Sequence, residues 1–262
     1  MIIFDFKDKT AIITGAGSGF GRATARLLAQ CGARIVGVDC NVQSLAQTMA
    51  GLPDISGGHL TIEMDLTHTA AASDVIARTM AHAAHLDILV NSAGVCHFTA
   101  ANNISPDEWD QVHEINLKSL YFLAVAAAEA MEPQRGGRII NLGSNAGRKG
   151  RAFSAHYAAA KAGVANVTES LALAYGKKGI TVNTVCPAVV LTDMWKRNFQ
   201  ELEPITGKPA EELVRKWTAD TPLRRLGTVE DVANLIVFLA SDRAGFITAQ
   251  EINVCGGFML TC

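Results

Sequence analysis

Short apolar segments rich in β-branched residues alternate along the chain with longer segments whose apolar positions recur every three to four residues. The first pattern is typical of buried strands and the second of amphipathic helices. The predicted strands are Ala11–Thr14, Ile35–Asp39, Thr61–Asp65, Ile88–Asn91, Arg138–Leu142, Ile180–Val185 and Ile252–Val254. The predicted helices are Gly19–Cys31, Val42–Ala50, Ala70–Ala83, Pro106–Met131, His156–Tyr175 and Val229–Ala240.

Helix-start signals and strand composition together indicate a fold class. Ser105 is followed by Pro106 and Glu108, and Thr228 is followed by Asp231, so each can act as an N-cap. Continuously apolar strands that alternate with helices are typical of a parallel sheet covered on both faces. We therefore predict a doubly wound α/β Rossmann fold with about seven strands. Since no linker or repeat divides the sequence, we expect residues 1–262 to form one domain.

The regular alternation is interrupted between residues 192 and 222. This segment is polar, contains Pro204 and Pro209, and holds two of the three tryptophans, Trp195 and Trp217. We expect one helix in it, Ala210–Ala219. A long excursion after a strand is typical of a lid over a binding site, and the alternative is a simple surface insertion.

Composition excludes several classes of protein. Of the 262 residues, 49% are hydrophobic and 18% charged, which excludes a disordered chain. A net charge of −2 provides no electrostatic footprint for nucleic acid or an anionic membrane. The six cysteines contain no C-x-x-C pair, and we expect them to be buried free thiols. Without an apolar run of signal-peptide or membrane-spanning length, we expect a cytoplasmic protein that spans no membrane and holds no metal.

A glycine-rich turn, Thr14-Gly-Ala-Gly-Ser-Gly-Phe-Gly21, joins the first predicted strand to a helix. Such a turn lets the backbone approach a pyrophosphate and points a helix N-terminus at its charge. The second strand ends in Asp39, whose carboxylate can accept hydrogen bonds from ribose hydroxyls and would repel a 2′-phosphate. Because Ser18 and Cys40 supply no cation nearby, we expect NAD as the cofactor. The alternative for Asp39 is a solvated residue that caps the next helix.

Tyr157 and Lys161 stand four residues apart in an alanine-rich segment, SAHYAAAKAG. On a helix these positions share one face. Alone, the pair is compatible with an ordinary surface helix on which Lys161 is solvated and Tyr157 partly buried. Tyr157 is, however, the only one of three tyrosines with a lysine at this spacing.

Taken together, these motifs resemble the short-chain dehydrogenase/reductase family, over residues 9–257. The resemblance rests on the glycine spacing, on Asn91-Ser-Ala-Gly94, on Asn116, on Ser144 thirteen positions before Tyr157, on Y-x-x-x-K, and on Pro187-Ala-Val-Val-Leu-Thr192. It implies a catalytic set of Asn116, Ser144, Tyr157 and Lys161. It further implies a cofactor site formed by Gly15, Ser18, Gly19, Phe20, Gly21, Asp39, Asp65, Leu66, Asn91, Ala93, Gly94, Tyr157, Lys161, Pro187, Val190 and Thr192.

The chemistry of alcohol oxidation explains these residue types. A free tyrosine has a pKa near 10, which is too high for an efficient base at neutral pH. A lysine ammonium on the same helix face stabilises the phenolate. Ser144 can hydrogen-bond the substrate oxygen, and by the resemblance Asn116 holds a water that links Lys161 to solvent.

Four positions depart from the family pattern. Ser92 replaces a second asparagine, and Ala188, Ala249 and Cys255 replace the family's usual glycine, glycine and aspartate. We expect Ser92 to alter a structural hydrogen bond rather than the chemistry. The other three put local loop geometry in question, Ala188 because its methyl group restricts φ.

Residues that follow the strands indicate the substrate side. We predict that His97, Asn145, His156 and Trp195 contact substrate, although each histidine could instead be a packing residue. Their polarity favours a polar, hydroxylated small molecule. The segment that begins Thr192-Asp-Met-Trp195 resembles the lids of the family's polyol, sugar-alcohol and vicinal-diol dehydrogenases, which implies that a polyol, sugar or sugar alcohol is oxidised as a secondary alcohol to a ketone. The alternatives are an NADPH-dependent 3-ketoacyl or carbonyl reductase and a non-catalytic dinucleotide sensor or scaffold. Two helical segments, Leu117–Met131 and Tyr157–Tyr175, are apolar on more than one face, which indicates a partner helix. The resemblance implies a homotetramer, because the family is commonly tetrameric.

Overall fold

Alternate residues of the first strand, β1 (Thr10–Thr14), enter two different hydrophobic cores. Ala11 and Ile13 pack in one core with helices α1 (Gly19–Gln30) and α9 (Val229–Ala240), and Ile12 packs in the other with α3 (Ala71–His82) and α5 (Ser119–Ala130). All three side chains are fully buried. A strand buried on both faces needs apolar residues at every position, which explains why its sequence does not alternate between polar and apolar.

A seven-stranded parallel sheet runs through the molecule in the order β3-β2-β1-β4-β5-β6-β7. The structure is a computed structural model that describes residues 4–68, 70–131 and 136–259. Beyond β1, the strands are β2 (Arg34–Asp39), β3 (Leu60–Glu63), β4 (Ile88–Asn91), β5 (Gly137–Leu142), β6 (Ile180–Pro187) and β7 (Glu251–Val254). The strand order reverses direction between β1 and β4, where a crevice opens at the carboxyl ends. The doubly wound fold class is thus confirmed.

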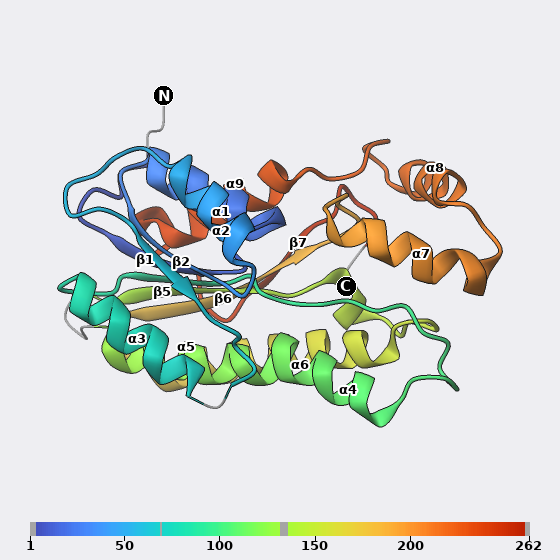
Figure 1. Cartoon of the computed structure of the whole chain (residues 1–262), viewed down its shortest axis with the longest axis horizontal. Coiled ribbons are helices and arrows are strands. Elements are labelled where there is room, and N and C mark those ends of the chain that lie inside the picture. Colours follow the sequence, from blue (N-terminus) through green and yellow to red (C-terminus); the bar gives the residue numbers. More distant parts are fainter. Residues whose placement is uncertain (1–3, 69, 132–135, 260–262) are drawn as a thin grey trace.

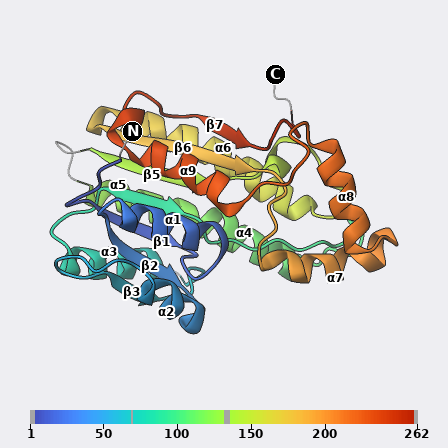
Figure 2. The same cartoon turned by 90° about the horizontal axis from the view of Figure 1, so that it is seen from above.

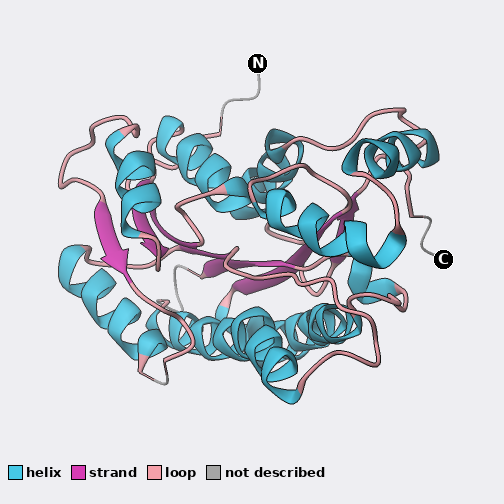
Figure 3. Cartoon of the chain, turned by 45° about the vertical axis from the view of Figure 1, so that its right-hand side comes forward, coloured by secondary structure: helices cyan, strands magenta, loops and turns pink. Residues whose placement is uncertain are grey.

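Helices cover both faces of this sheet (Figures 1 and 3). One layer holds α1 (Gly19–Gln30), α2 (Val42–Ala50) and α9 (Val229–Ala240). The opposite layer holds α3 (Ala71–His82), α4 (Pro106–His113), α5 (Ser119–Ala130) and α6 (Ala155–Tyr175). None of the described helices is both long and apolar enough to cross a membrane.

The predicted helix Pro106–Met131 is in fact three consecutive segments. Between α4 and α5 lies one π-helical turn, Glu114–Lys118. The side-chain amide of Asn116 donates to the carbonyl oxygens of Val112 (2.9 Å) and Val95 (2.8 Å). A side chain that bonds a carbonyl of the preceding turn competes with the regular helical ladder, and hydrophobic periodicity carries no signal for such a local change.

The segment 192–222 contains two helices, not the single one predicted. They are α7 (Met194–Thr206) and α8 (Ala210–Asp220), which extend beyond the carboxyl end of the sheet (Figure 2). Pro204 lies inside α7, and because proline usually ends or kinks a helix, the sequence does not predict one there. Four aromatic rings pack between these two helices and the loop that follows β4, which we call the β4 loop. The ring centroid of Trp195 lies 5.1 Å from that of Trp217, 5.9 Å from that of Phe98 and 5.3 Å from that of Phe199.

Several local predictions can be compared with the structure directly. Ser105 accepts a hydrogen bond from the Glu108 amide, and Thr228 and Asp231 form a reciprocal capping box, so both N-caps are confirmed. Strand β3 ends at Glu63, two residues before Asp65, so the predicted end of this strand is wrong. The expectation of buried cysteines is wrong for Cys40, which is exposed, and for Cys31 and Cys255, which are only half-buried. All five described cysteines are free, and Cys262 lies outside the described residues.

Candidate active site

A cavity of about 410 Å³ opens at the carboxyl ends of the strands. It extends from the glycine turn after β1, past the ends of β2 and β3, to the start of α6 and the lid helices α7 and α8. All four predicted catalytic residues line it. So do fourteen of the sixteen predicted cofactor residues: Gly15, Ser18, Gly19, Phe20, Asp39, Asp65, Leu66, Ala93, Gly94, Tyr157, Lys161, Pro187, Val190 and Thr192.

The glycine turn needs glycine for two separate reasons. Gly15 and Gly19 have φ values of +66° and +48°, which disfavour any side chain. At Gly21, a Cβ atom would lie 2.1 Å from the Gly15 carbonyl oxygen. Gly21 does not line the cavity; its role is to let α1 pack against the turn, which places the helix N-terminus at the cavity wall.

Asp39 is fixed at the end of β2 by two backbone amides. Its Oδ2 accepts from Gly17 at 2.9 Å and its Oδ1 accepts from Asn41 at 2.9 Å. Each oxygen keeps a further lone pair for a ligand hydroxyl. Arg22 lies close by, but its guanidinium donates to the Gly17 carbonyl oxygen and to Thr48 Oγ1 and does not line the cavity. Among described lining residues, the basic ones are Arg151 and Lys161.

Asn91 is a buried structural residue that does not line the cavity. Its amide donates to Asn141 Oδ1 (3.0 Å), Asn141 donates to Thr168 Oγ1 (2.9 Å), and Thr168 bonds Thr184 (2.7 Å). This chain joins β4, β5, α6 and β6. It holds the strand ends that carry the neighbouring lining residues, since buried polar groups that all find partners resist displacement.

Ser92 occupies the first departure from the family pattern. Its backbone amide and that of Ala93 both donate to Thr14 Oγ1, each at 3.0 Å. The β4 loop is therefore attached to the end of β1 through the backbone.

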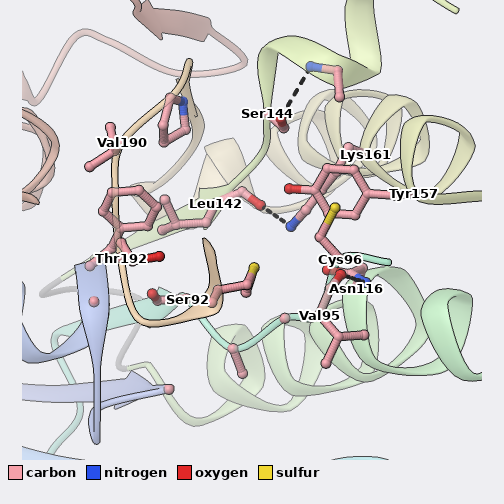
Figure 4. A pocket seen from close by; sticks show the side chains of 18 of the residues that line it. Ser92, Val95, Cys96, Asn116, Leu142, Ser144, Tyr157, Lys161, Val190 and Thr192 are labelled. Atoms are coloured by element: carbon pink, nitrogen blue, oxygen red, sulfur yellow. Dashed lines mark hydrogen bonds between the residues drawn. The ribbon is translucent and has the colours of Figure 1, made fainter. Parts of the chain in front are cut away.

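Ser144, Tyr157 and Lys161 converge on one end of the cavity (Figure 4). Ser144 follows β5, and its hydroxyl accepts a bond from the Ala146 amide at 3.1 Å. Lys161 is 4% exposed and donates to the Leu142 carbonyl oxygen at 2.6 Å. Its ammonium nitrogen lies 5.8 Å from the centre of the Tyr157 ring, as the one-turn spacing on α6 requires.

Burial shifts the ionisation of this group. It raises the pKa of Tyr157 well above its ordinary value, and a hydrogen bond with Ser144 opposes the rise. It also lowers the pKa of Lys161 to about 8. Both charged forms are therefore disfavoured, and a phenolate at Tyr157 needs positive charge beside it.

Asn116 presents an unused acceptor to this group. Its Oδ1 is buried without a partner among the described residues. A methyl group on Gly94 would come within 2.6 Å of that oxygen and 3.8 Å of Lys161 Nζ, so the two polar atoms flank one small space. Gly94 therefore keeps the approach between Asn116 and Lys161 open.

The four predicted substrate contacts divide into two pairs. Asn145 and Trp195 line the cavity, whereas His97 and His156 do not. His97 Nδ1 lies 3.1 Å from Glu201 Oε1 on α7. His156 is fully buried with its Nε2 3.0 Å from Glu108 Oε1, and burial lowers its pKa. Both histidines are therefore packing residues that connect elements around the cavity.

Sequence reasoning missed several lining residues on the lid side. They are Phe98, Asn198, Trp217 and Phe258. A prediction of α7 would have put Trp195 and Asn198 three residues apart on one helix face, so the signal existed but was hidden by Pro204.

The distant parts of the cavity fit the two ends of a nicotinamide dinucleotide. The glycine turn lines the cavity at the N-terminus of α1, which suits a pyrophosphate. Asp39 has free lone pairs for hydroxyls, and Lys161 has donors beyond its bond to Leu142. The fold and site together define a dinucleotide-binding α/β oxidoreductase.

Comparison with known proteins identifies the family. Residues 15–259 match a family model described as enoyl-(acyl carrier protein) reductase. The chain belongs to the short-chain dehydrogenase/reductase family, whose members bind a nicotinamide dinucleotide. It is 35% identical over 256 residues to the 3-oxoacyl-[acyl-carrier-protein] reductase FabG of Escherichia coli, covering 98% of this chain and 99% of that protein.

Two further relatives are named as sugar or polyol dehydrogenases. A sorbitol dehydrogenase of Cereibacter sphaeroides is 35% identical over 250 residues, covering 95% of this chain and 96% of that protein. A crystal structure titled short-chain dehydrogenase/reductase SDR:glucose/ribitol dehydrogenase, from Brucella melitensis, superposes with a TM-score of 0.89 at 30% identity. That match covers 99% of this chain and all of the other. Relatives of equal identity thus carry different substrate names.

Proposed function

We propose that this protein is an NAD-dependent dehydrogenase that interconverts a secondary alcohol and a ketone on a small polar substrate, such as a polyol, sugar or sugar alcohol. The observation that carries the proposal is one cavity with Ser144, Tyr157 and Lys161 at one end and Asp39 at the other. The first set suits proton transfer from an alcohol. The second suits an adenosine ribose without a 2′-phosphate.

The preference for NAD rests on charge at the end of β2. Asp39 brings a carboxylate to the cavity wall, and neither Ser18 nor Cys40 beside it carries a positive charge. A 2′-phosphate at this position would be repelled by the Asp39 carboxylate. The nearby Arg22 guanidinium is bonded to Gly17 and Thr48 and does not line the cavity. Asp65 and Leu66, after β3, line the same region and would contact the adenine.

Tyr157 acts as general base during oxidation and as general acid during reduction. When bound, NAD⁺ accepts the hydride and brings a positive ring to this end of the cavity. Lys161 stabilises the Tyr157 phenolate, which burial alone disfavours, because the ammonium lies one helical turn away. The remaining donors of Lys161 are available to ribose hydroxyls.

Ser144 and Asn116 complete the proton chemistry. The Ser144 hydroxyl is close enough to Tyr157 to share a hydrogen bond, so a substrate oxygen placed between them would be held by both. The unpaired Oδ1 of Asn116 and the donors of Lys161 can together hold a water across the space beside Gly94. Such a water would return the proton of Tyr157 to solvent.

Two other activities are considered for the same site. The names of the FabG relatives favour a 3-ketoacyl reductase, for which NADPH would be the cofactor, whereas the family description names an enoyl reductase. Asp39 opposes that cofactor, and the polar lining residues Asn145, Arg151 and Asn198 oppose a long acyl chain. A non-catalytic sensor would not need Ser144, Tyr157 and Lys161 together.

Assembly and location form part of the proposal. The exposed apolar residues Tyr121 and Phe122 on α5, Leu173 on α6 and Phe246 before β7 support a homotetramer. Light scattering after size exclusion should give a mass of four chains. We also propose a cytoplasmic location, where the free cysteines would stay reduced.

The test is a screen of NAD⁺ and NADP⁺ reduction over polyols, sugars, diols, hydroxy acids and 3-hydroxyacyl thioesters. We expect turnover of a hydroxylated small molecule with NAD⁺. Tyr157→Phe should retain NADH binding and lower kcat by at least about 100-fold, the usual contribution of a general base. Tyr175→Phe is the matched control, because Tyr175 lies at the far end of α6 and does not line the cavity. Turnover retained in Tyr157→Phe would refute the mechanism.

A further inference from the structure

Arg151 is a cation at the end of the cavity that holds Tyr157, and among the described residues it forms no ion pair with a carboxylate. It lies on the loop between β5 and α6 and is half-buried. Within the described chain its one hydrogen bond is to Asn145 Oδ1, at 3.4 Å. Burial lowers the pKa of the Arg151 guanidinium, and an electrostatic interaction with Tyr157 opposes that shift. The Arg151 guanidinium therefore lies close to Tyr157, the proposed base, and its positive charge is not neutralised by a carboxylate of the described chain.

The carboxylates around the cavity are placed elsewhere or already engaged. Asp39 and Asp65 line it at the opposite end, beside β2 and β3. Glu108 accepts from Thr99 Oγ1 at 2.7 Å and pairs with His156. Glu201 accepts from the Phe98 amide at 2.9 Å and pairs with His97. Neither glutamate lines the cavity, so neither neutralises Arg151 there.

Asn198 adds a second polar group without a partner. It belongs to α7, lines the cavity and is 2% exposed. Its Oδ1 makes no hydrogen bond to the described residues. A buried amide without a partner costs free energy that a bound ligand can recover. The loop before α6 and the lid therefore each hold one unsatisfied polar group in the same cavity.

We propose that the substrate carries an anionic group, a carboxylate or a phosphate, which the Arg151 guanidinium binds, while the amide of Asn198 hydrogen-bonds a second polar group of that substrate. This inference rests on the proposed function and narrows its substrate class from neutral polyols and sugars to sugar acids, hydroxy acids or sugar phosphates. The planar guanidinium offers paired donors that match the two oxygens of either anion. The hydrogen bond from Arg151 to Asn145 restricts rotation of the guanidinium group.

The experiment measures ligand binding to the NADH-loaded protein by calorimetry, so that it does not depend on turnover. The ligands are matched sets of three to six carbons: each polyol, the aldonate with the same carbon chain, and the polyol phosphorylated at its terminal hydroxyl. The variants are Arg151→Met, Arg151→Lys, Asn198→Ala and Lys149→Met. Lys149 is the matched control because it removes one positive charge from the same loop but is exposed and does not line the cavity.

We expect an anionic member of at least one set to bind at least about tenfold more tightly than its neutral counterpart, as charge-assisted hydrogen bonds would provide. Arg151→Met should remove that preference and leave neutral binding within about threefold, Arg151→Lys should remove only part of it, and Lys149→Met should remove none. Asn198→Ala should weaken anionic and neutral ligands alike. Comparing aldonates with phosphorylated polyols shows whether the site prefers a carboxylate or a phosphate group.

The inference is overturned if no anion binds better than its polyol, if nothing binds, or if Arg151→Met weakens neutral and anionic ligands equally. The proposed function fails separately, when no alcohol in the screen reduces NAD⁺ in the wild-type protein. If anionic ligands bind more tightly than neutral ones but no alcohol is oxidised, the anion-binding site at Arg151 would stand and the proposed dehydrogenase activity would be refuted.

Discussion

The Asp39 carboxylate and the Gly17 amide are bonded at 2.9 Å, and a Cβ atom at position 17 would lie 2.8 Å from the same carboxylate oxygen. The glycine turn after β1 therefore packs directly against the Asp39 side chain at the end of β2, which leaves no space for a side chain at position 17. The negative charge at this end of the cavity has a defined position, because the backbone holds both of its oxygens.

Asp39→Asn tests whether that charge selects the cofactor. The amide can keep the bond from Gly17 but carries no charge. We expect discrimination against NADP⁺ to fall by about tenfold, as loss of one charge-assisted contact and of repulsion would produce. The measurement is the ratio of kcat/KM for NAD⁺ and NADP⁺. Cys40→Ser, which changes the neighbouring position without changing charge, should leave the ratio unaltered; a ratio equally unaltered by Asp39→Asn would argue against the role of the charge.

Lys161 makes stability depend on pH in a direction opposite to that of a paired lysine. Burial lowers its pKa from 10.5 to about 8 in the folded protein. Between these values the unfolded chain binds more protons than the folded one, so stability rises with pH. From pH 7 to 9 the contribution should increase by about 1.4 kcal/mol, as expected for one group that titrates at pH 8.

The measurement is urea unfolding of the wild-type protein and of Lys161→Met, both without cofactor, at pH 7 and pH 9. Subtracting the two proteins cancels the other titrating groups. The difference in unfolding free energy, wild type minus variant, should rise with pH. A constant difference would mean that Lys161 keeps an ordinary pKa.

Glu201 connects helix α7 to the β4 loop. It accepts from the Phe98 amide, lies 3.1 Å from His97, and is 3.6 Å from Arg197 on its own helix. Glu201→Ala should loosen α7 and raise the KM for substrate several-fold, with little change in NADH affinity, because lid contacts act on the substrate side. Steady-state kinetics and NADH titration measure both. Glu203→Ala, an exposed neighbour on α7, serves as control; equal effects of the two variants would contradict the attachment.

Ala249 is in a conformation that favours glycine. Its φ is +58°, while its amide donates to the Val182 carbonyl oxygen at 2.8 Å. A left-handed alanine costs about 1–2 kcal/mol, and the greater freedom of glycine in the unfolded chain offsets part of this. We expect Ala249→Gly to raise the free energy of unfolding by about 0.5–1 kcal/mol. In denaturant titrations Ala219→Gly, on the exposed helix α8, should instead lower it by a similar amount.

Elements with strong periodicity could be predicted from the sequence, and so could the family. Each of the seven strands was predicted to within three residues at either end, because buried parallel strands are continuously apolar. The cavity is lined by Gly15, Gly19, Asp39, Ser144, Tyr157 and Lys161, because the motifs place these residues at strand ends or on one helix face.

What could not be predicted depends on contacts between distant segments. His97 and His156 lie outside the cavity because Glu201 and Glu108, more than 45 residues away in each case, hold them in other directions. Asn198 was missed because Pro204 concealed α7. The left-handed conformation of Ala249 could not be predicted from the sequence, since the family resemblance indicates only that glycine is usual at this position.

The π-helical turn at Glu114–Lys118 has a consequence for chain register. A turn closed by i to i+5 bonds contains one residue more than a regular turn, so every side chain of α5 is rotated by about 100° from where a continuous helix would put it. The single surplus residue thus selects which side of α5 meets the sheet and which side presents Tyr121 and Phe122 outward. A deletion of one residue in this turn would rotate that face back toward the sheet, so the length of a five-residue segment determines the outer surface of a twelve-residue helix.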